Sequence, residues 1–434
     1  MKSAKSINRN IPHPKMKNIF NFKVALSTKS INNILRLATL AAACLTLPTH
    51  ALAQSSCPGD LNGDGEVDSS DVGSLLLDFG PCPAPAPSIT LVHPSSGPTV
   101  GTAKTIVGTN FTGATSVTVG GIAASYVVVS ANTITAISPA NSVVGAVDIV
   151  VDTPNGTDTL VGGFTYFDSS WYTILEQAPN ATAVPDADMR AAIVASGFPW
   201  RVRDNSSGIE MLLIPSDKIN LGCSASNVYA CDDNESPIHT VELSRAFYLS
   251  KTEVTQAQWQ AKMGSNPSIF KNNSDSPSRP VENVSWNDIA VFNTATGLRL
   301  PSEAEWEYAC RGNTTTAFHS MPGYPNGTND DSLLGNIAWF NAYTQTQPVA
   351  GKAANGFGIY DMSGNVEEWC NDWFGDYSGF NATDPAGPST GTYRVLRGGN
   401  WFYGSNNCRS SYRHSRDPDY RSMNLGFRVT RTPQ

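Results

Sequence analysis

Short stretches that alternate apolar and polar residues dominate the chain between residues 88 and 167. Ser116–Val119, 126–129 and 147–151 are rich in Val, Ile and Thr, and Gly, Asn and Pro separate such stretches. Alternation with a period of two gives a strand one buried and one exposed face. Several short strands at regular spacing predict an antiparallel β-sandwich over residues 88–167.

Helical signals are short and lie further along the chain. Residues 185–195 begin with acidic residues and are followed by Gly197, which predicts a helix inside a connector over residues 168–199. From residue 200 onward the apolar pattern predicts both strands and helices. Strands are expected over 209–215 and 247–255, and helices over 256–263, with Thr255 as N-cap, and 287–293.

A capping box marks the start of one more helix, over residues 302–311. Ser302 and Glu305 stand three positions apart, so each side chain can accept a hydrogen bond from the other's backbone N–H. The helical period then places Trp306 and Ala309 on the buried face and the glutamates on the exposed face.

The first 53 residues have the features of a secretory leader. They carry eight Lys/Arg and no acidic residue, and an apolar run over 37–47 precedes the small residues 51–53. This order predicts a signal peptide over residues 1–53, cleaved after Ala53, and a periplasmic, cell-surface or extracellular location. Cys44 follows three alanines and leaves lipoprotein cleavage open. No other segment approaches the ~20 apolar residues of a membrane span.

Removal of this leader makes the net charge of the remaining chain strongly negative. The remaining residues hold 21 Lys/Arg against 37 Asp/Glu, a net charge of −16. Such an excess of acid argues against nucleic acid or an anionic membrane as a partner. It suits a soluble protein that binds calcium.

A calcium-binding loop is predicted in a small module over residues 54–82. Oxygen ligands recur at alternate positions of a twelve-residue stretch, and Gly65 stands at position 6, where the loop must turn sharply. Hard oxygen ligands at this spacing are what calcium requires. The six ligands are Asp60, Asn62, Asp64, the backbone carbonyl of Glu66, Asp68 and Asp71.

The final ligand of this loop is Asp71 rather than the usual Glu, and in this the module resembles an EF-hand-like dockerin repeat. Dockerins that bind cohesins carry two such loops. A single loop argues against a cohesin partner, and the alternative is a calcium-stabilised mini-domain without a partner.

A Pro-rich linker over residues 83–87 leads into the predicted sandwich. The strings ITLVHPSSGP, VGTNF and VGG, which begin at residues 89, 107 and 119, resemble the immunoglobulin-like IPT/TIG domains. The resemblance covers nearly all of residues 88–167 and implies a spacer or adhesion module.

Cysteine spacing indicates two disulfides in an oxidising compartment. Cys57 and Cys82 flank the calcium module, and Cys223 and Cys231 flank a short loop. An odd number then remains downstream, so at least one thiol is free or paired between chains. These three are Cys310, Cys370 and Cys408.

The C-terminal part is dense in Trp, Gly and Asn. The strings GFGIYDMSGNVEEWCNDW from residue 356, RVLRGGNWFYGSNNCRSSYR from residue 394 and MNLGFRV from residue 423 resemble the formylglycine-generating enzymes, or sulfatase-modifying factors. The resemblance covers residues 200–434. It implies an irregular α+β domain related to C-type lectins.

The resemblance implies a site in which two cysteines five positions apart hold Cu(I), a sulfatase cysteine joins them, and oxygen converts that cysteine to formylglycine. Here Cys408 stands at the second position and Tyr403 at the first. A phenol is a poor ligand for Cu(I), so the pattern argues against a copper site. Cys408 is then a buried remnant, a partner of Cys310 or Cys370, or a reactive thiol whose pKa Arg409 and Arg413 lower.

The resemblance also implies a second calcium site. The family binds calcium with a Gly-Asn-x-x-Glu stretch, which here supplies Gly364, Asn365, Val366 and Glu368. Backbone carbonyls and one carboxylate form a suitable oxygen shell. The alternative is a packed loop in which Glu368 accepts from a backbone amide.

The leading hypothesis is a secreted binding module that has lost the copper pair and takes a protein or glycan ligand. Tyr, Trp, Ser, Asn and Arg are abundant over residues 400–424, a composition of adaptable binding surfaces. The alternatives are a formylglycine-generating oxidase that depends on Cys408, and a structural extracellular protein. Candidate binding residues are Trp369, Asn400, Trp401, Tyr403, Arg413 and Asn424.

Overall fold

The computed structural model describes residues 84–141, 143–223, 231–341 and 343–433. The described residues, from Ala84 onward, belong to one compact unit of the chain. The predicted signal peptide, the calcium loop from Asp60 to Asp71 and the Cys57–Cys82 disulfide therefore lie outside the described residues, and they stay predictions.

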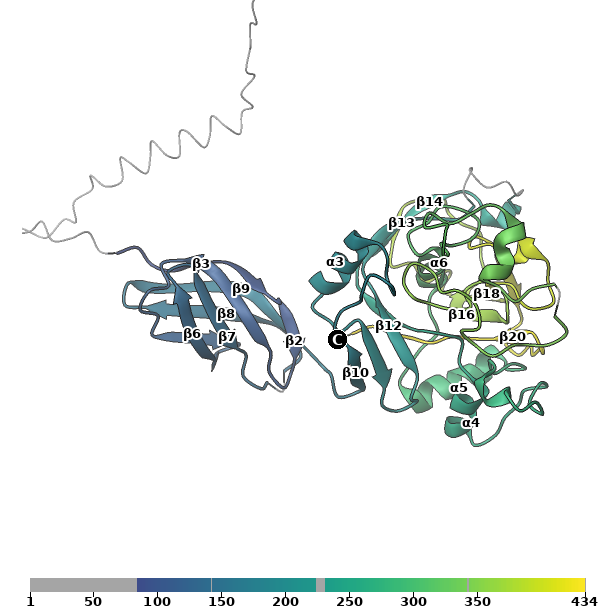
Figure 1. The fold of residues 1–434 in the computed structure, drawn as a ribbon, viewed down its shortest axis with the longest axis horizontal. Helices are drawn as coiled ribbons and strands as arrows, with labels where there is room; N and C mark the ends of the chain where they lie inside the picture. The colour runs from purple at the N-terminus through teal and green to yellow at the C-terminus, as the bar shows by residue number, and fades with distance from the viewer. Residues whose placement is uncertain (1–83, 142, 224–230, 342, 434) are drawn as a thin grey trace, which may run out of the picture. The chain divides into compact units, whose positions relative to one another are not determined.

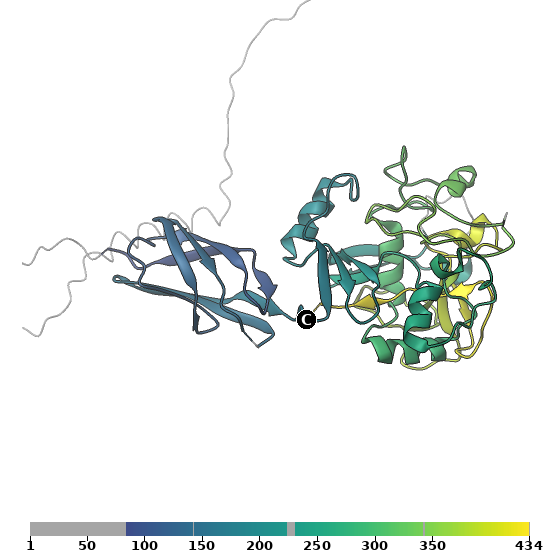
Figure 2. The same ribbon diagram turned by 60° about the horizontal axis from the view of Figure 1, so that its bottom comes forward.

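Nine strands form the predicted sandwich, in two sheets that face each other (Figures 1 and 2). The first sheet has the order β1-β3-β7-β6 and the second the order β2-β9-β8-β4-β5. The strands are β1 (Ser88–His93), β2 (Ser96–Pro98), β3 (Ala103–Thr109), β4 (Ser116–Val119), β5 (Ile122–Ala123), β6 (Ser125–Ser130), β7 (Thr133–Ile137), β8 (Gly145–Thr153) and β9 (Gly156–Phe167).

Alternation explains why these strands form a sandwich. Every second residue of β3 and β7 is buried, and Ile106 and Ile134 pair across the two strands with no exposed surface. Phe111, Val151 and Phe164 close the same core from other strands and loops. The prediction of an antiparallel sandwich is confirmed, apart from the parallel β2–β9 pair.

Three further sheets and a set of helices build the domain that follows the sandwich. The sheet orders are β10-β11-β12-β15-β21, β13-β14-β17 and β19-β18-β16-β20. The strands are β10 (Tyr172–Glu176), β11 (Arg201–Asp204), β12 (Glu210–Ile214), β13 (Asp217–Leu221), β14 (His239–Leu243), β15 (Phe247–Ser250), β16 (Glu367–Trp373), β17 (Ala382–Thr383), β18 (Arg394–Arg397), β19 (His414–Arg416), β20 (Leu425–Gly426) and β21 (Thr430–Arg431).

Thr255 and Ser302 are N-caps as the sequence predicts, and Ser285 is a third N-cap that we did not predict from the sequence. Thr255, Ser285 and Ser302 each accept from the backbone N–H three residues on and complete a capping box, and α4, α5 and α6 each end at a left-handed glycine. The α-helices are α3 (Ala187–Ala195), α4 (Gln256–Met263), α5 (Trp286–Thr296) and α6 (Glu303–Arg311), and the short 3-10 helices are η1 (Asp233–Glu235), η2 (Ser276–Ser278), η3 (Asp331–Asn336) and η4 (Ser405–Cys408).

One detail of α6 differs from the prediction, because its glutamates are not all exposed. Glu303 and Glu307 are buried, and each pairs with arginines from distant segments. Arg397 of β18 reaches both glutamates, while Arg413 pairs with Glu303. A buried carboxylate is tolerated when its charge is compensated in this way. Local periodicity cannot predict partners more than 80 residues away.

The helices α3, α4, α5 and α6 pack against the sheets of this domain through one large apolar core. Trp306 of α6, Trp369 of β16 and Phe427 are all fully buried in it. Among the described residues, no helix combines the length and the apolar character needed to cross a lipid bilayer.

Candidate functional site

The sheet β19-β18-β16-β20 positions the segment that carries the candidate chemistry. Glu367 at the start of β16 pairs with Leu425 of β20, and His414 of β19 pairs with Leu396 of β18. Because β18 also pairs with β16, residues from three distant parts of the sequence meet at one end of this sheet. The chain from residue 398 to residue 413 closes over them.

Two glycines begin this closing segment with left-handed backbone. Gly398 has φ 93° and Gly399 has φ 67°. A Cβ at Gly399 would lie 2.7 Å from the carbonyl oxygen of Asn407 and 2.9 Å from Cys408 Sγ. Only glycine therefore allows the turn to pass directly over the thiol.

Asn400 fixes the turn that presents the aromatic side chains. It is fully buried, and its Oδ1 accepts from the backbone N–H groups of Phe402 and Tyr403 at 3.0 and 3.1 Å. Its Nδ2 is buried without a hydrogen-bond partner among the described residues. Asn400 is thus a structural determinant of this loop rather than a surface contact.

A cavity of about 180 Å³ opens beside this turn. Aromatic side chains dominate its wall, and Phe402, Tyr420 and Met423 are 62%, 44% and 45% exposed. Large exposed apolar groups around a hollow are typical of a recognition site. The lining residues are Glu367, Leu396, Trp401, Phe402, Tyr403, His414, Arg416, Tyr420, Ser422, Met423, Asn424 and Leu425.

A His–Glu pair lies in the wall of this cavity. His414 Nδ1 is 2.7 Å from Glu367 Oε1, and the side chains are 20% and 4% exposed. Because a carboxylate only accepts, Nδ1 carries the proton in this bond, which orients the ring and leaves Nε2 for another partner. The ring of Tyr403 lies 6.5 Å from the His414 ring.

Cys408 does not face this cavity. It is fully buried in a small apolar cluster with residues such as Phe318, Met321 and Leu334. Burial raises the pKa of its thiol, the nearby Glu367 charge adds to the effect, and the backbone N–H of Asn400 opposes it. A thiol held protonated in an apolar cluster is poorly suited to act as a nucleophile or metal ligand.

The two arginines expected to activate Cys408 have other partners. Arg409 donates to both oxygens of Glu235 at 2.6 and 2.7 Å, with both side chains fully buried. Arg413 donates to both oxygens of Glu303. The interpretation that they lower the pKa of the thiol is therefore wrong.

The donors at the two motif positions do not fit a copper site. Tyr403 lines the cavity, whereas Cys408 packs in the core behind the turn. Burial and Glu367 raise the pKa of the Tyr403 hydroxyl, which disfavours a phenolate. A protonated phenol and a protonated thiol offer neither of the soft anionic ligands that Cu(I) prefers.

Glu368, the carboxylate assigned to calcium by resemblance, already has strong partners. Arg428 donates to its two oxygens at 2.7 and 2.8 Å, and Trp306 Nε1 donates to it at 2.6 Å. The oxygens of Glu368 are thus occupied by an ion pair with a guanidinium, not by a backbone amide. No group of three or more His, Cys, Asp or Glu side chains in the described ranges is arranged to hold a metal ion.

Other buried acids lie close to the same stretch. The side chain of Asn365 and the backbone N–H of Val366 both donate to Glu253. Burial and the neighbouring acids Asp361 and Glu368 raise the pKa of Glu253 well above its ordinary value. Burial likewise raises the pKa of Asp361 to about 6. Gly364–Glu368 is therefore a tightly packed polar interior.

The structure divides the predicted binding residues into three groups. Trp401, Tyr403 and Asn424 line the cavity. Trp369 is fully buried and donates to the carbonyl of Val284, and Arg413 is 3% exposed in its ion pair, so neither reaches a ligand. Asn400 acts through the turn.

Sequence reasoning missed several lining residues, above all Glu367. It stands beside the residues assigned to calcium, and only the parallel pairing of β16 with β20 brings it to the cavity. Phe402, Arg416 and Met423 were also missed. They lie in the aromatic and Arg-rich segment 400–424, whose composition is the one signal that could have found them.

The structure shows the state of the cysteines within the described residues. Cys223 and Cys231 form the predicted disulfide. Cys310, Cys370 and Cys408 are free and buried. Pairing of Cys408 with Cys310 or Cys370 is therefore wrong, and the buried thiol is the alternative that fits.

Comparison with known families matches both domains. The family described as "Sulfatase-modifying factor enzyme 1-like domain" matches residues 201–433. The "IPT/TIG domain" family matches residues 87–166. The two matches cover the α+β domain and the sandwich, respectively.

Individual relatives resemble parts of this chain. The formylglycine-generating enzyme of Thermomonospora curvata is 36% identical over an alignment of 197 residues, and the match covers 42% of this chain and 63% of that enzyme. Chaperone protein LppX of Paenibacillus barcinonensis is 32% identical over an alignment of 237 residues, and the match covers 43% of this chain and 80% of that protein. Variable protein 1 of Treponema denticola has a TM-score of 0.46 and 32% identity over 52% of this chain and 95% of its own.

The family match over residues 201–433 spans the strands β16, β18, β19 and β20, on which the cavity is built. The chain spans less than two thirds of the length of the formylglycine-generating enzyme from Thermomonospora curvata. The domain match, by contrast, covers more than half of this chain and includes all of β11 to β21. The chain belongs to the sulfatase-modifying factor enzyme 1-like family, with an IPT/TIG domain before the family domain.

Proposed function

We propose that the family domain of this chain is a binding module and that the aromatic cavity beside Tyr403 receives its ligand. One observation carries the proposal. Tyr403, at the place of the family's first cysteine, lines the cavity, whereas Cys408 is buried in a separate apolar cluster. The segment thus keeps its shape without bringing two thiols together.

The chemistry of the cavity wall supports recognition of a protein or glycan segment. Phe402 and Tyr420 offer exposed ring surface, and His414, Arg416 and Asn424 offer polar groups around it. Rigid aromatic anchors with adaptable polar neighbours are typical of binding surfaces. The His414–Glu367 bond fixes one of these polar groups before any ligand arrives.

Formylglycine formation is the competing function, and it is favoured by the family itself. The reaction in that family needs two thiolates at one place. Cys408 is fully buried, its thiol stays protonated, and no second cysteine follows the Gly398–Gly399 pair at the required position. These observations weigh against the oxidase.

The proposal is tested by screening the full chain on arrays of short peptides and of glycans. Phe402→Ala removes an exposed ring at the cavity, and Phe380→Ala removes a still more exposed ring elsewhere on the domain. We expect a ligand that binds the wild type and Phe380→Ala alike and binds Phe402→Ala at least about tenfold more weakly. Equal binding by all three proteins would overturn the proposal.

Secretion and calcium binding form a second, separate part of the proposal. The Cys223–Cys231 disulfide supports an oxidising compartment. The ligand spacing from Asp60 to Asp71 supports one calcium ion. Calorimetry with calcium should show binding that Asp60→Asn weakens strongly, and an unchanged titration would contradict this part.

A further inference from the structure

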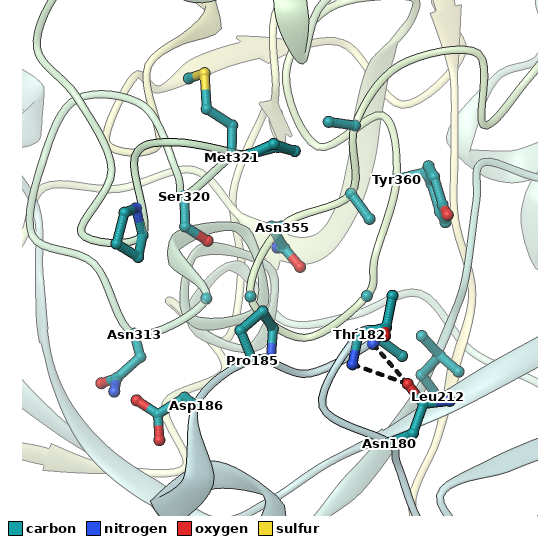
Figure 3. A pocket seen from close by; sticks show the side chains of 18 of the residues that line it. Asn180, Thr182, Pro185, Asp186, Leu212, Asn313, Ser320, Met321, Asn355 and Tyr360 are labelled. Atoms are coloured by element: carbon teal, nitrogen blue, oxygen red, sulfur yellow. Dashed lines mark hydrogen bonds between the residues drawn. The ribbon is translucent and has the colours of Figure 1, made fainter.

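A second cavity, of about 840 Å³, lies in the same domain and is separate from the Tyr403 cavity (Figure 3). No residue lines both. Its walls come from residues 176–186 before α3, from the loop 312–326 after α6, from the loop 352–360 and from Trp200, Arg201, Leu212 and Lys251. In Figure 3, Asp186 and Asn313 lie on one side, Tyr360 on the other, and Ser320 and Asn355 between them.

The basic groups of this cleft have partners within the protein, whereas the Asp186 carboxylate accepts, among the described residues, only from the backbone N–H of Met189, as the N-cap of α3. Arg201 donates to Glu176 and Glu210, and Lys251 Nζ lies 3.8 Å from Glu210. Lys352 Nζ donates to a backbone carbonyl at 2.6 Å. The lining charges are of both signs, so the cleft offers little to a ligand with a net charge of either sign. These lining residues are Glu176, Asp186, Arg201, Lys251 and Lys352.

Neutral polar groups, in contrast, remain available. Thr182 Oγ1, Ser320 Oγ and the side-chain amides of Asn313 and Asn326 line the cleft and have no hydrogen-bond partner within the described part of the chain. Each hydroxyl and amide can both donate and accept. The ring of Tyr360 adds a partly exposed apolar surface to the same wall.

One buried donor also borders the cleft. Trp200 is 3% exposed, and its indole Nε1 is buried without a partner among the described residues. The adjoining ring carbon Cζ2 lies 3.6 Å from the position of a Cβ at Gly358, another lining residue. An unpaired buried N–H costs free energy that an acceptor from a bound molecule would recover.

We propose that this cleft binds an uncharged, hydroxyl-rich ligand, namely a neutral oligosaccharide. Sugar hydroxyls match groups that both donate and accept, and the apolar face of a sugar ring suits Tyr360. The volume lies within the range of ligand sites. A peptide is the less fitting occupant because its backbone presents donors and acceptors in a fixed alternation.

The test is calorimetric titration of the full chain with cellotriose, maltotriose, xylotriose, mannotriose and triacetylchitotriose. We expect at least one to bind with a millimolar or lower Kd. Ala354→Trp fills the cleft and should abolish this binding, whereas Ala295→Trp adds the same side chain to an exposed position of α5 and should not. Asn313→Ala should weaken binding about fivefold.

Other outcomes would overturn the inference. No binding of any of the five sugars, binding that survives both Ala354→Trp and Asn313→Ala, or binding lost in Phe402→Ala would each contradict it. The last result would assign the sugar to the Tyr403 cavity instead. Neutral tripeptides that bind in place of sugars and are blocked by Ala354→Trp would show a peptide cleft. Should Ala354→Trp not fold, Asn313→Ala decides.

Discussion

At the scale of single residues, the environment of Cys408 governs what chemistry the domain can perform. The thiol lies behind the Gly398–Gly399 turn and packs against Phe318 and Met321. Desolvation favours the neutral thiol over the thiolate. Cys408 thus contributes to the packing of the domain interior.

The first prediction concerns the reactivity of that thiol. Native protein treated with iodoacetamide at pH 8 should leave Cys408 unmodified, because alkylation requires an exposed thiolate. Peptide mass spectrometry after labelling in denaturant should then find it modified. Rapid labelling of Cys408 in the native protein would contradict the account.

Asp372 gives the pH dependence of stability a definite sign. Burial, followed by the nearby charge of Glu303, raises the pKa of Asp372 to about 8. An unfolded Asp titrates at about 3.9. Between these values the folded state holds a proton that the unfolded state has lost, so stability falls as pH rises through this window.

Asp372→Asn should therefore stabilise the protein only at high pH. We expect little change in the free energy of unfolding at pH 4, and a gain on the order of 2–4 kcal/mol at pH 9. Urea denaturation at both values measures this difference, with the exposed Asp376→Asn as control. A gain that is equal at both pH values would contradict the argument.

At the scale of elements, local signals predicted more than long-range ones. The N-caps Thr255 and Ser302 and the strand Ser116–Val119 follow from neighbouring residues and are confirmed. Glu303 and Glu367 were misjudged or missed, because their partners Arg413 and His414 lie 110 and 47 residues away. Pairings of that kind arise only when the sheet forms.

The ion pair between Glu235 of η1 and Arg409, which follows η4, also joins segments that are distant in the sequence. Glu235 and Arg409 are fully buried and doubly hydrogen-bonded across 174 residues. Arg409→Met leaves a buried carboxylate alone and should cost about 3–5 kcal/mol. Arg203→Met breaks a pair in which the arginine is 49% exposed and should cost under about 1 kcal/mol.

Chemical denaturation of the two variants measures both costs. Adding Glu235→Gln to Arg409→Met should recover part of the loss, because it removes the uncompensated charge. Equal losses of unfolding free energy in Arg409→Met and Arg203→Met would show that the buried pair contributes no more to stability than the exposed one.

At the scale of the whole molecule, the chain combines an IPT/TIG domain with a sulfatase-modifying factor enzyme 1-like domain. Within the family domain the sheet β19-β18-β16-β20 positions the segment that follows two glycines. Tyr403 of that segment lines an aromatic cavity, and Cys408 is buried apart from it. Retained fold with altered side chains is how one scaffold hosts several functions.

The most direct test of this account is a turnover measurement. The full chain would be incubated with Cu(I), oxygen, a reductant and a Cys-x-Pro-x-Arg peptide, and mass spectrometry would follow conversion of the peptide thiol to an aldehyde. Circular dichroism would show that the protein is folded. The account predicts no aldehyde. Aldehyde that appears with the wild type and vanishes in Cys408→Ser would contradict it and establish an oxidase with one thiol.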